Sequence, residues 1–261
     1  MAITLRSRRE IELMRKAGAI VADVLLKLKE IAEPGTTTAW LDSVALQMTA
    51  DAGAEALFKG VRSPVARIPF PGAICASINE QVVHGIPSED TKLKNGDILS
   101  IDFGVRLNGY CADAAVTIAI GEISENRRKL MDVTKSVLGI AIEKSAPAVR
   151  WSQVATEMQR YAESAGFSIV KDFVGHGIGK KMHEEPRVPN FVSDELLAND
   201  IVLAEGMVLA VEPMINAGSS AVRTLKNGWT VVTRDGKSSA HFEHTIVILG
   251  NGCEVLTING Y

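Results

Sequence analysis

The chain contains two copies of one weak pattern. Nineteen residues separate Pro34 from Gly53, and the same number separate Pro147 from Gly166. A proline after one helix and a glycine after the next are typical helix boundaries, so each copy predicts a helix between these two residues. Matches this short can arise by chance, but the equal spacing favours an internal repeat.

Strand-like segments extend the repeat into the second part of each copy. GDILSIDFGV (96–105) aligns with GMVLAVEPMI (206–215), and the following segments, NGYCADAAVTIAIG and SSAHFEHTIVILG, also align. Two independent matches between acids favour a real duplication. These matches place Asp102 on Glu212 and Asp113 on Glu243.

Local patterns support this organisation. Ser7 and Glu10 have capping-box spacing and begin an apolar period of three and four residues. No linker rich in Pro, Gly or Ser divides the chain, so we expect one catalytic domain, 1–261, with halves at about 7–121 and 122–257. The expected helices cover 7–31, 36–52 and 125–146, and the expected strands cover 74–78, 98–105 and 114–120.

Composition excludes several classes of protein. The 261 residues are 46% hydrophobic and 23% charged, which argues against disorder. The net charge of −3 argues against general binding to nucleic acid or to an anionic membrane. The N-terminus lacks the apolar region of a signal peptide, no segment is apolar enough to span a membrane, and the three cysteines form no C-x-x-C motif. We expect a cytoplasmic protein with reduced thiols.

Four acids, Asp102, Asp113, Glu212 and Glu243, lie inside apolar strand-like segments. Burial of an ionised carboxylate is costly unless the group is paired or binds a metal. Salt bridges are the simpler explanation, but the neighbours in SIDFG, CADAA, AVEPM and HFEHT include no Lys or Arg. One buried acid is more often structural, whereas four at repeated positions favour divalent cations.

A nitrogen ligand is available at His176, which lies between two glycines after an apolar segment. A lone histidine is more often structural, but glycines on both sides let the backbone come close and turn sharply, which would present the imidazole. His183 is a further candidate, although it also fits an ordinary loop histidine, and so is His84, which follows an apolar strand-like segment and precedes a glycine. Four carboxylates and one imidazole suit two divalent metals about 3.5–4 Å apart, and leave Mn, Fe, Co and Zn open.

These residues lie in motifs that resemble those of the type I methionine aminopeptidases, in order along nearly the whole chain. The resemblance implies the pita-bread (creatinase/aminopeptidase) fold, an α+β architecture in which a curved antiparallel sheet is backed by two helix pairs with internal two-fold pseudo-symmetry. The motifs are SINEQVVHGIP (77–87), GDILSIDFG (96–104), GYCAD (109–113), GHGIGKKMHEEP (175–186), GMVLAVEPM (206–214), RTLKNGWTVVTRDGKSSAHFEHT (223–245) and NGCEVLT (251–257).

The resemblance implies a role for each site residue. Asp102 and Asp113 would bind one metal, with Asp113 bridging to a second, which His176 and Glu212 would bind; Glu243 would bridge both. Glu212 would also move the proton between water and the leaving amine. The residues that would contact the substrate or reaction intermediate are His84 and His183, and those that would form the methionine pocket are Phe70, Cys75, Met182 and Trp229.

The implied activity is metal-dependent removal of the N-terminal methionine from nascent proteins and peptides whose second residue is small. A hydroxide bridging the two metals would attack the first peptide bond. The expected partners are therefore nascent polypeptide N-termini, and ribosome association is implied by the resemblance alone. We expect a monomer that contacts neither nucleic acid nor a membrane.

Three positions depart from the family pattern. Arg67 stands near a position where the family commonly has an aromatic residue, so the resemblance does not determine the conformation of this loop or the rim of the methionine pocket. His241 stands where the family usually has Gln, and Phe242 stands where it usually has Tyr. Because of Arg67, a paralogue that accepts a narrower range of substrates is an alternative interpretation. A prolidase or Xaa-Pro aminopeptidase would need a large extra N-terminal domain, and a non-catalytic binding relative would usually have lost metal ligands.

Overall fold

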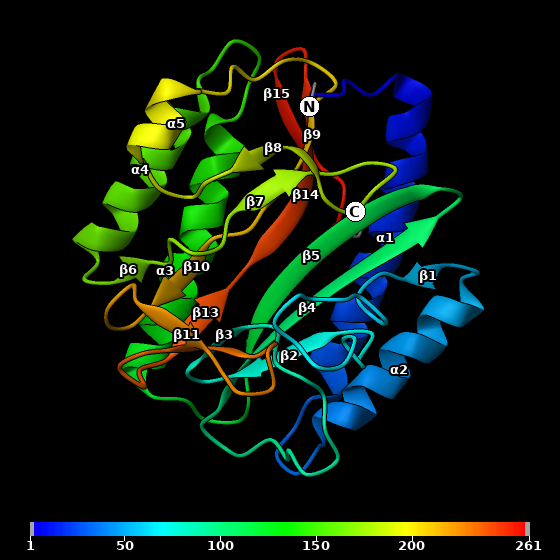
Figure 1. Ribbon diagram of the computed structural model, residues 1–261, viewed down its shortest axis with the longest axis vertical. Coiled ribbons are helices and arrows are strands. Elements are labelled where there is room, and N and C mark those ends of the chain that lie inside the picture. Colours follow the sequence, from blue (N-terminus) through cyan, green and yellow to red (C-terminus); the bar gives the residue numbers. More distant parts are fainter. Residues whose placement is uncertain (1–2, 259–261) are drawn as a thin grey trace.

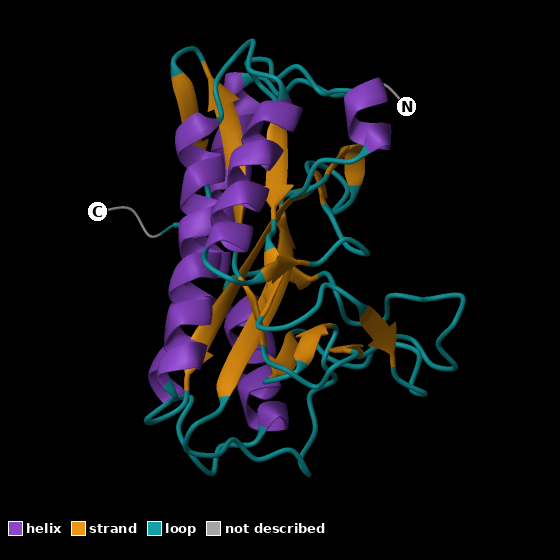
Figure 2. Ribbon diagram, turned by 90° about the vertical axis from the view of Figure 1, so that its left-hand side faces the viewer, coloured by secondary structure: helices purple, strands orange, loops and turns teal. Residues whose placement is uncertain are grey.

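Two pairs of helices cover one side of a large sheet in the computed structural model, which describes residues 3–258 (Figures 1 and 2). The first half contributes α1 (Arg8–Ile31) and α2 (Thr38–Asp51), and the second contributes α3 (Glu125–Lys144) and α4 (Trp151–Ser164). A short helix, α5 (Asp194–Ala198), follows. No helix among the described residues is long and apolar enough to cross a membrane.

The helix boundaries follow the predicted signals. Ser7 caps α1 through a capping box with Glu10, as expected from their spacing. Helices α2 and α4 are each followed by a C-cap alanine and then by a glycine with positive φ, +65° at Gly53 and +88° at Gly166. The equal spacing in the sequence therefore reflects two equivalent helices with the same kind of C-terminal stop.

The large sheet has nine strands and is antiparallel throughout. Its main path runs β1-β4-β5-β14-β9-β7-β8, while β2 pairs with β4 and β15 pairs with β14. This arrangement confirms the α+β class and the antiparallel sheet backed by two helix pairs. The strands are β1 (Glu55–Ala56), β2 (Cys75–Ile78), β4 (Ile98–Leu107), β5 (Tyr110–Ala119), β7 (Gly175–Gly177), β8 (Glu184–Val188), β9 (Val208–Val211), β14 (Glu243–Leu249) and β15 (Gly252–Val255).

Two three-stranded sheets and several loops lie on the side of the large sheet away from the helices (Figure 2). One has the order β13-β10-β6 and the other has the order β11-β12-β3. Their strands are β3 (Gln81–Val83), β6 (Ser168–Ile169), β10 (Met214–Asn216), β11 (Val222–Thr224), β12 (Val231–Thr233) and β13 (Ser239–His241). The large sheet is thus covered by helices on one face and by loops on the other.

Strand β5 begins earlier than the predicted residue 114. Asn108 and Gly109 both have positive φ, +51° and +82°, which is the backbone of a tight two-residue hairpin turn. Leu107 therefore pairs with Tyr110, and the ladder runs from there without a break. The hairpin brings Asp113 into the strand, where its alternation with neighbours fixes the direction of its side chain.

Individual hydrogen bonds repeat between the halves. The amide of Gly35 donates to Leu93, and the equivalent amide of Ala148 donates to Leu203, at 2.8 Å in both cases. The isolated bridge between Thr37 and Lys92 likewise recurs between Arg150 and Val202. The internal repeat is thus present in the backbone contacts that precede the sheet in each half.

The predicted match of Asp113 with Glu243 is wrong by two residues. Leu99 pairs with Ile118 in one half and Leu209 pairs with Ile246 in the other, which makes Ala115 the equivalent of Glu243. In the same way, the Thr117 hydroxyl binds both backbone groups of His241, and the Thr245 hydroxyl binds both backbone groups of Asp113. The structural equivalent of Asp113 is therefore His241. Both acids still point to one face, because a slip of two preserves the alternation of a strand.

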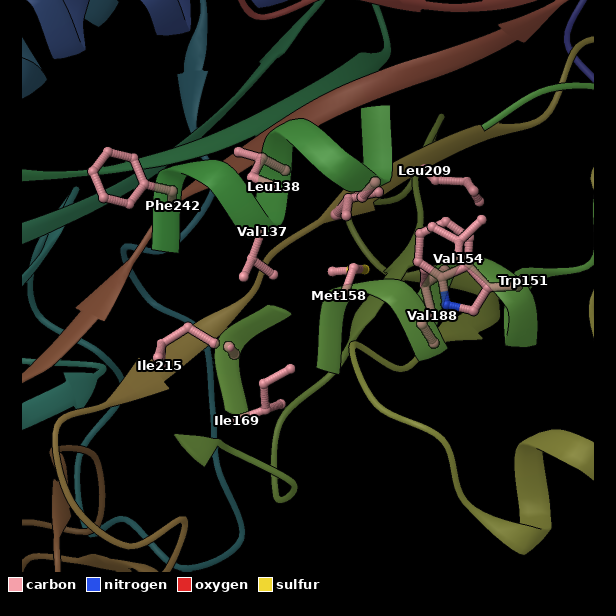
Figure 3. Packing of buried hydrophobic residues seen from close by; sticks show 14 of the residues in the cluster. Val137, Leu138, Trp151, Val154, Met158, Ile169, Val188, Leu209, Ile215 and Phe242 are labelled. Atoms are coloured by element: carbon pink, nitrogen blue, oxygen red, sulfur yellow. The ribbon is translucent and has the colours of Figure 1, made fainter. Parts of the chain in front are cut away.

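Two separate hydrophobic clusters hold the helices on the sheet. One packs α1 and α2 against β4 and β5, and the other packs α3 and α4 against the second half. Trp151, Val154 and Met158 of α4 lie fully buried in the second cluster, with Ile169 and Leu209 nearby (Figure 3). Each such side chain contributes about 1.5–3 kcal/mol on burial, so the layers are fixed mainly by apolar contacts. The opposite face of the sheet is left for polar groups.

Candidate active site

Strand register brings the acids of the first half to one face. In the β4–β5 ladder Asp102 lies opposite Ala115, and Asp113 lies opposite Gly104. Paired residues, and residues two apart, share a face of the sheet. Phe103, between these positions, packs toward α1, so Asp102 and Asp113 point to the face without helices. A Cβ at Gly104 would lie 3.1 Å from Asp113 Oδ1, so the glycine leaves room for the carboxylate.

The second half supplies its side chains to the same face. Glu243 of β14 pairs with Ala115, and His176 of β7 pairs with Ala210, which in turn pairs with Thr245. Glu212 follows the end of β9, where Asn190 donates a hydrogen bond of 3.2 Å to its carbonyl oxygen. The acids and the imidazole of both halves therefore converge across the centre of the sheet.

One small cavity of about 110 Å³ receives all eleven of the side chains that the sequence predicted for the site. The cavity also contacts Phe58 and Val61, which the sequence did not suggest. It is lined by Phe58, Val61, Phe70, Cys75, His84, Asp102, Asp113, His176, Met182, His183, Glu212, Trp229 and Glu243.

Three of these residues form a tight set of potential metal ligands. One ligand atom each from Asp113, His176 and Glu243 lies within 4.8 Å of the other two, and all three residues are buried. Glu212 joins them through Oε1, which is 3.7 Å from His176 Nε2. His176 Nδ1 lies 2.9 Å from the Gly177 carbonyl, so Nδ1 carries the proton and leaves the Nε2 lone pair free for a metal.

The acids are not neutralised by basic side chains. Within the described part of the chain, no Lys or Arg forms an ion pair with any of the four, and Asp102 Oδ1, Asp113 Oδ1 and Glu243 Oε1 are buried without a hydrogen-bond partner. Burial raises the pKa of Asp113 to about 7. Burial, with the charge of neighbouring carboxylates, also raises the pKa of the other three well above the usual value.

This donor set fits divalent cations. Unpaired buried oxygens are costly in a protein interior, and bound cations would satisfy them while stabilising the ionised carboxylates. Oxygen-rich ligation with one imidazole is the ligand type of Mn, Fe, Co and Zn sites. The residues present therefore match the metal that the motifs imply.

Gly175 and Gly177 allow neighbouring segments to approach β7 closely, and they do not form the predicted sharp turn. Both lie in β7 without positive φ, and a Cβ on either would lie 2.2–2.3 Å from a carbonyl oxygen of a neighbouring segment. Only glycine fits this spacing. The two glycines thus allow His176 to sit between β8 and β9 with its ring toward the cavity.

Two further histidines border the metal ligands. The ring of His183, an exposed residue just before β8, lies 4.4 Å from that of His176. His84 follows β3 with φ of +58°, and its ring lies edge-on to that of Trp229 at 6.4 Å. Desolvation lowers the pKa of His84 to about 4 and also lowers that of His183, so both rings are neutral near pH 7.

The remaining side of the cavity is apolar. Phe70 and Trp229 are buried and meet edge to face with ring centroids 5.3 Å apart. The Trp229 indole N–H donates to the Ile68 carbonyl at 2.9 Å, which ties the aromatic ring to the loop before β2. Cys75, buried in β2 opposite Asp102, and the partly buried Met182 join this wall.

The loop between β1 and β2 brings Phe58 and Val61, which the sequence did not predict as site residues, into the cavity. Two backbone hydrogen bonds link Phe70 to Gly60 and Val61, which brings Phe58 and Val61 into the cavity. No spacing in the sequence marks this pairing. Arg67, the departure from the family pattern in the same loop, is exposed and does not line the cavity.

Comparisons with known proteins agree with these observations. The model of metallopeptidase family M24 matches residues 12–249. The methionine aminopeptidase of Clostridium perfringens is 49% identical over 98% of this chain and 99% of its own. The crystal structure of the methionine aminopeptidase from Thermotoga maritima superposes with a TM-score of 0.93 at 39% identity, covering 99% of this chain and 100% of that one.

A more distant structure shares the fold alone. The prolidase from Pyrococcus furiosus superposes with a TM-score of 0.74 at 22% identity, and the match covers 98% of this chain but 66% of the prolidase. The similarity to methionine aminopeptidases is much higher and extends over both chains. The chain therefore belongs to metallopeptidase family M24 and, within it, to the methionine aminopeptidases.

Proposed function

We propose that this cavity removes the N-terminal methionine from polypeptides whose second residue is small. One observation carries the proposal: a single cavity joins five ligand-type side chains to a wall of apolar side chains. The first group suits a hydrolytic metal centre, and the second suits an unbranched thioether side chain. Membership of the methionine aminopeptidases supports the same reaction.

The centre is proposed to hold two divalent cations. Asp102, Asp113, His176, Glu212 and Glu243 provide enough donors for two ions, and the buried oxygens without partners support this number. Bound cations would polarise the scissile carbonyl and lower the pKa of water to near neutrality. The residues that hold them also fix where the first peptide bond must lie.

Glu212 is the proposed proton carrier. Its side chain is 15% exposed, against 2% for that of Glu243, and burial raises its pKa. A carboxylate with a raised pKa can accept a proton from water and release it to the leaving amine at neutral pH. Its backbone is anchored by Asn190, which keeps this carboxylate at the cavity.

His84 and His183 are proposed to bind the reacting peptide. Both are neutral, so each ring has one N–H to donate, to the scissile amide or to the oxygen that gains negative charge. His183 stands at the open end, beside His176. A large second residue would meet His183 as the peptide leaves the cavity, which accounts for a preference for small residues.

The proposed partners are nascent polypeptides, encountered in the cytoplasm by a monomeric enzyme. A free N-terminal methionine followed by a small residue is a feature of newly made chains. Ribosome association would bring enzyme and substrate together. Sedimentation of the purified protein alone and with ribosomes measures both oligomeric state and association.

Hydrolysis of two peptides tests the proposal. Chelated protein is supplied separately with Mn, Co, Fe or Zn and offered Met-Ala-Ser or Ala-Pro. We expect release of methionine with at least one metal, two bound metal equivalents at saturation, and no cleavage of Ala-Pro. Cleavage of Ala-Pro in preference to Met-Ala-Ser would instead indicate a prolidase, and absence of stoichiometric metal binding would remove the proposed centre.

A further inference from the structure

His241 is a buried polar residue that has no role in the reaction described so far. It lies at the end of β13, is 1% exposed, and its Nε2 atom has no hydrogen-bond partner. A buried ring nitrogen without a partner is costly, so its position calls for an explanation. The resemblance to type I methionine aminopeptidases leads one to expect glutamine at this position, so the imidazole departs from the usual family residue.

The unpartnered nitrogen faces two of the metal-site acids. His241 Nε2 lies 3.9 Å from Glu212 Oε2 and 3.9 Å from Glu243 Oε2. The other oxygen of each glutamate faces elsewhere: Glu212 Oε1 lies 3.7 Å from His176 Nε2, and Glu243 Oε1 is buried without a partner. The two glutamates thus each present one oxygen to His241, while the other oxygen of Glu212 lies beside the candidate ligand His176.

The backbone holds His241 firmly in this place. Its N–H and carbonyl both bind the Thr117 hydroxyl at 2.8 Å, which reproduces the two bonds between Asp113 and Thr245 in the other half. The repeat therefore gives His241 the position that Asp113, a proposed ligand, has in the first half.

The surroundings of His241 Nε2 determine whether this nitrogen carries a proton or a lone pair. Two carboxylate oxygens face this nitrogen, and a lone pair would be repelled by both. A proton on Nε2 makes the same contacts electrostatically attractive once the glutamates are ionised. The ring is also outside the set of Asp113, His176 and Glu243, whose ligand atoms lie within 4.8 Å of one another.

We infer that His241 is a positioning residue of the metal centre, whose Nε2–H attracts the facing oxygens of Glu212 and Glu243 and so orients both carboxylates toward the cations. The inference rests on the proposed metal centre. It assigns His241 no contact with substrate and no bond to metal. Its effect is on the affinity of the site for metal, because the carboxylates are held in their binding orientation before the cations arrive.

Metal affinity of three variants tests the inference. Chelated protein is titrated with Mn²⁺ by calorimetry, for the wild type, His241→Leu, His241→Gln and His244→Gln. His244 is the matched control, since it is the third residue along the chain from His241, and its ring points to the helix side, where Nδ1 meets Thr257. Loss of the donor in His241→Leu should weaken Mn²⁺ binding by about 10–100-fold.

The glutamine variant separates positioning from ligation. A glutamine amide reaches nearly as far as imidazole Nε2 and donates a hydrogen bond, but it is a poor ligand for these cations. We expect His241→Gln to bind Mn²⁺ within about threefold of the wild type. Equal losses in the Gln and Leu variants would show that His241 is itself a ligand and would overturn the inference. Unchanged affinity in His241→Leu would overturn it as well, by leaving only a packing role.

Failure of the metal centre would look different. A wild-type protein that binds no Mn²⁺ contradicts the proposed function, whereas a wild type that binds with all variants unchanged contradicts only the role of His241. Thermal unfolding of the chelated variants shows whether His241→Leu is folded.

A second measurement uses the wild type alone and so does not depend on the folding of a variant. Nitrogen chemical shifts of ¹⁵N-labelled histidines distinguish the two neutral tautomers. With Zn²⁺ bound, His241 should carry its proton on Nε2, and His176 should carry its proton on Nδ1, which faces the Gly177 carbonyl. A proton on Nδ1 of His241 would overturn the inference.

Discussion

The two walls of the cavity are built in opposite ways. The acid wall (Asp102, Asp113, His176, Glu212 and Glu243) stands on or directly beside the paired strands of the large sheet. The apolar wall (Phe58, Val61, Phe70, Cys75, Met182 and Trp229) comes mostly from loops, with Cys75 alone in a strand of that sheet. Register fixes the first wall, whereas side-chain packing and a few hydrogen bonds fix the second.

The two walls also have opposite effects on the stability of the folded protein. The carboxylates of the acid wall are buried without basic partners and raise one another's pKa, so without metal they destabilise the fold. The aromatic side chains of the apolar wall gain free energy from burial whether or not a ligand is present. Changes in the acid wall should therefore cost activity more than stability, and changes in the apolar wall should affect substrate affinity.

Glu212→Gln should have the largest effect, because it removes both a proposed ligand and the proposed proton carrier. We expect kcat for Met-Ala-Ser to fall by about 10³-fold or more, since proton transfer alone contributes about 10²–10⁴-fold. The loss of a buried negative charge should leave the chelated protein at least as stable as the wild type. Wild-type turnover by a variant that is folded would refute the role of Glu212.

His183→Ala tests whether a residue beside the acid wall acts on the substrate without binding metal. Loss of one hydrogen-bond donor to the reacting peptide should lower kcat by about 10²–10³-fold. The metal content should not change, because the ring of His183 contacts His176 but is not within the ligand set. The kinetic constants are measured with metal at saturation, and an unchanged kcat would remove His183 from the reaction.

The two walls also differed in how well the sequence predicted them. Asp102, Asp113 and Glu243 lie inside apolar strand segments, so their charges were enough to predict that they belong to one metal site, and the alternation of the strands places them on one face. The register between halves was not predictable to the residue, and His241 rather than Glu243 proved to be equivalent to Asp113. Phe58 and Val61 were missed because loop contacts with Phe70 leave no periodic signal.

Trp229→Ala should have a smaller effect than the changes in the acid wall or at His183. Removal of the indole opens the proposed methionine pocket and releases the loop carbonyl of Ile68. We expect kcat/KM to fall by about 10–100-fold, as pocket contacts of this size are worth about 1–3 kcal/mol. Trp40→Ala is the matched control, because Trp40 is 57% exposed on α2. A change in metal affinity in Trp229→Ala would show that the two walls are not independent.

The smallest expected effect is a loss of stability with rising pH in the chelated protein. Burial raises the pKa of Asp113 to about 7 from 3.8, so the folded state keeps a proton that the unfolded state releases. This contribution is complete below pH 4 and is lost as the pH rises through 7. The buried histidines have lowered pKa values and act in the opposite direction below about pH 6.5.

In the window from pH 6.5 to 8, the difference between the wild type and Asp113→Asn isolates the acid wall, because the histidines, still partly protonated in the unfolded state near pH 6.5, contribute equally to both proteins. Asp113 alone should lower the free energy of unfolding by about 1 kcal/mol across this window, or about 2–4 °C in Tm. Saturating Mn²⁺ should abolish this contribution, since cations hold the carboxylates ionised, and Asp113→Asn should remove it from chelated protein. Equal changes of Tm across this window in the chelated wild type and in chelated Asp113→Asn would mean that Asp113 does not destabilise the fold, and would remove the proposed difference in cost between the two walls.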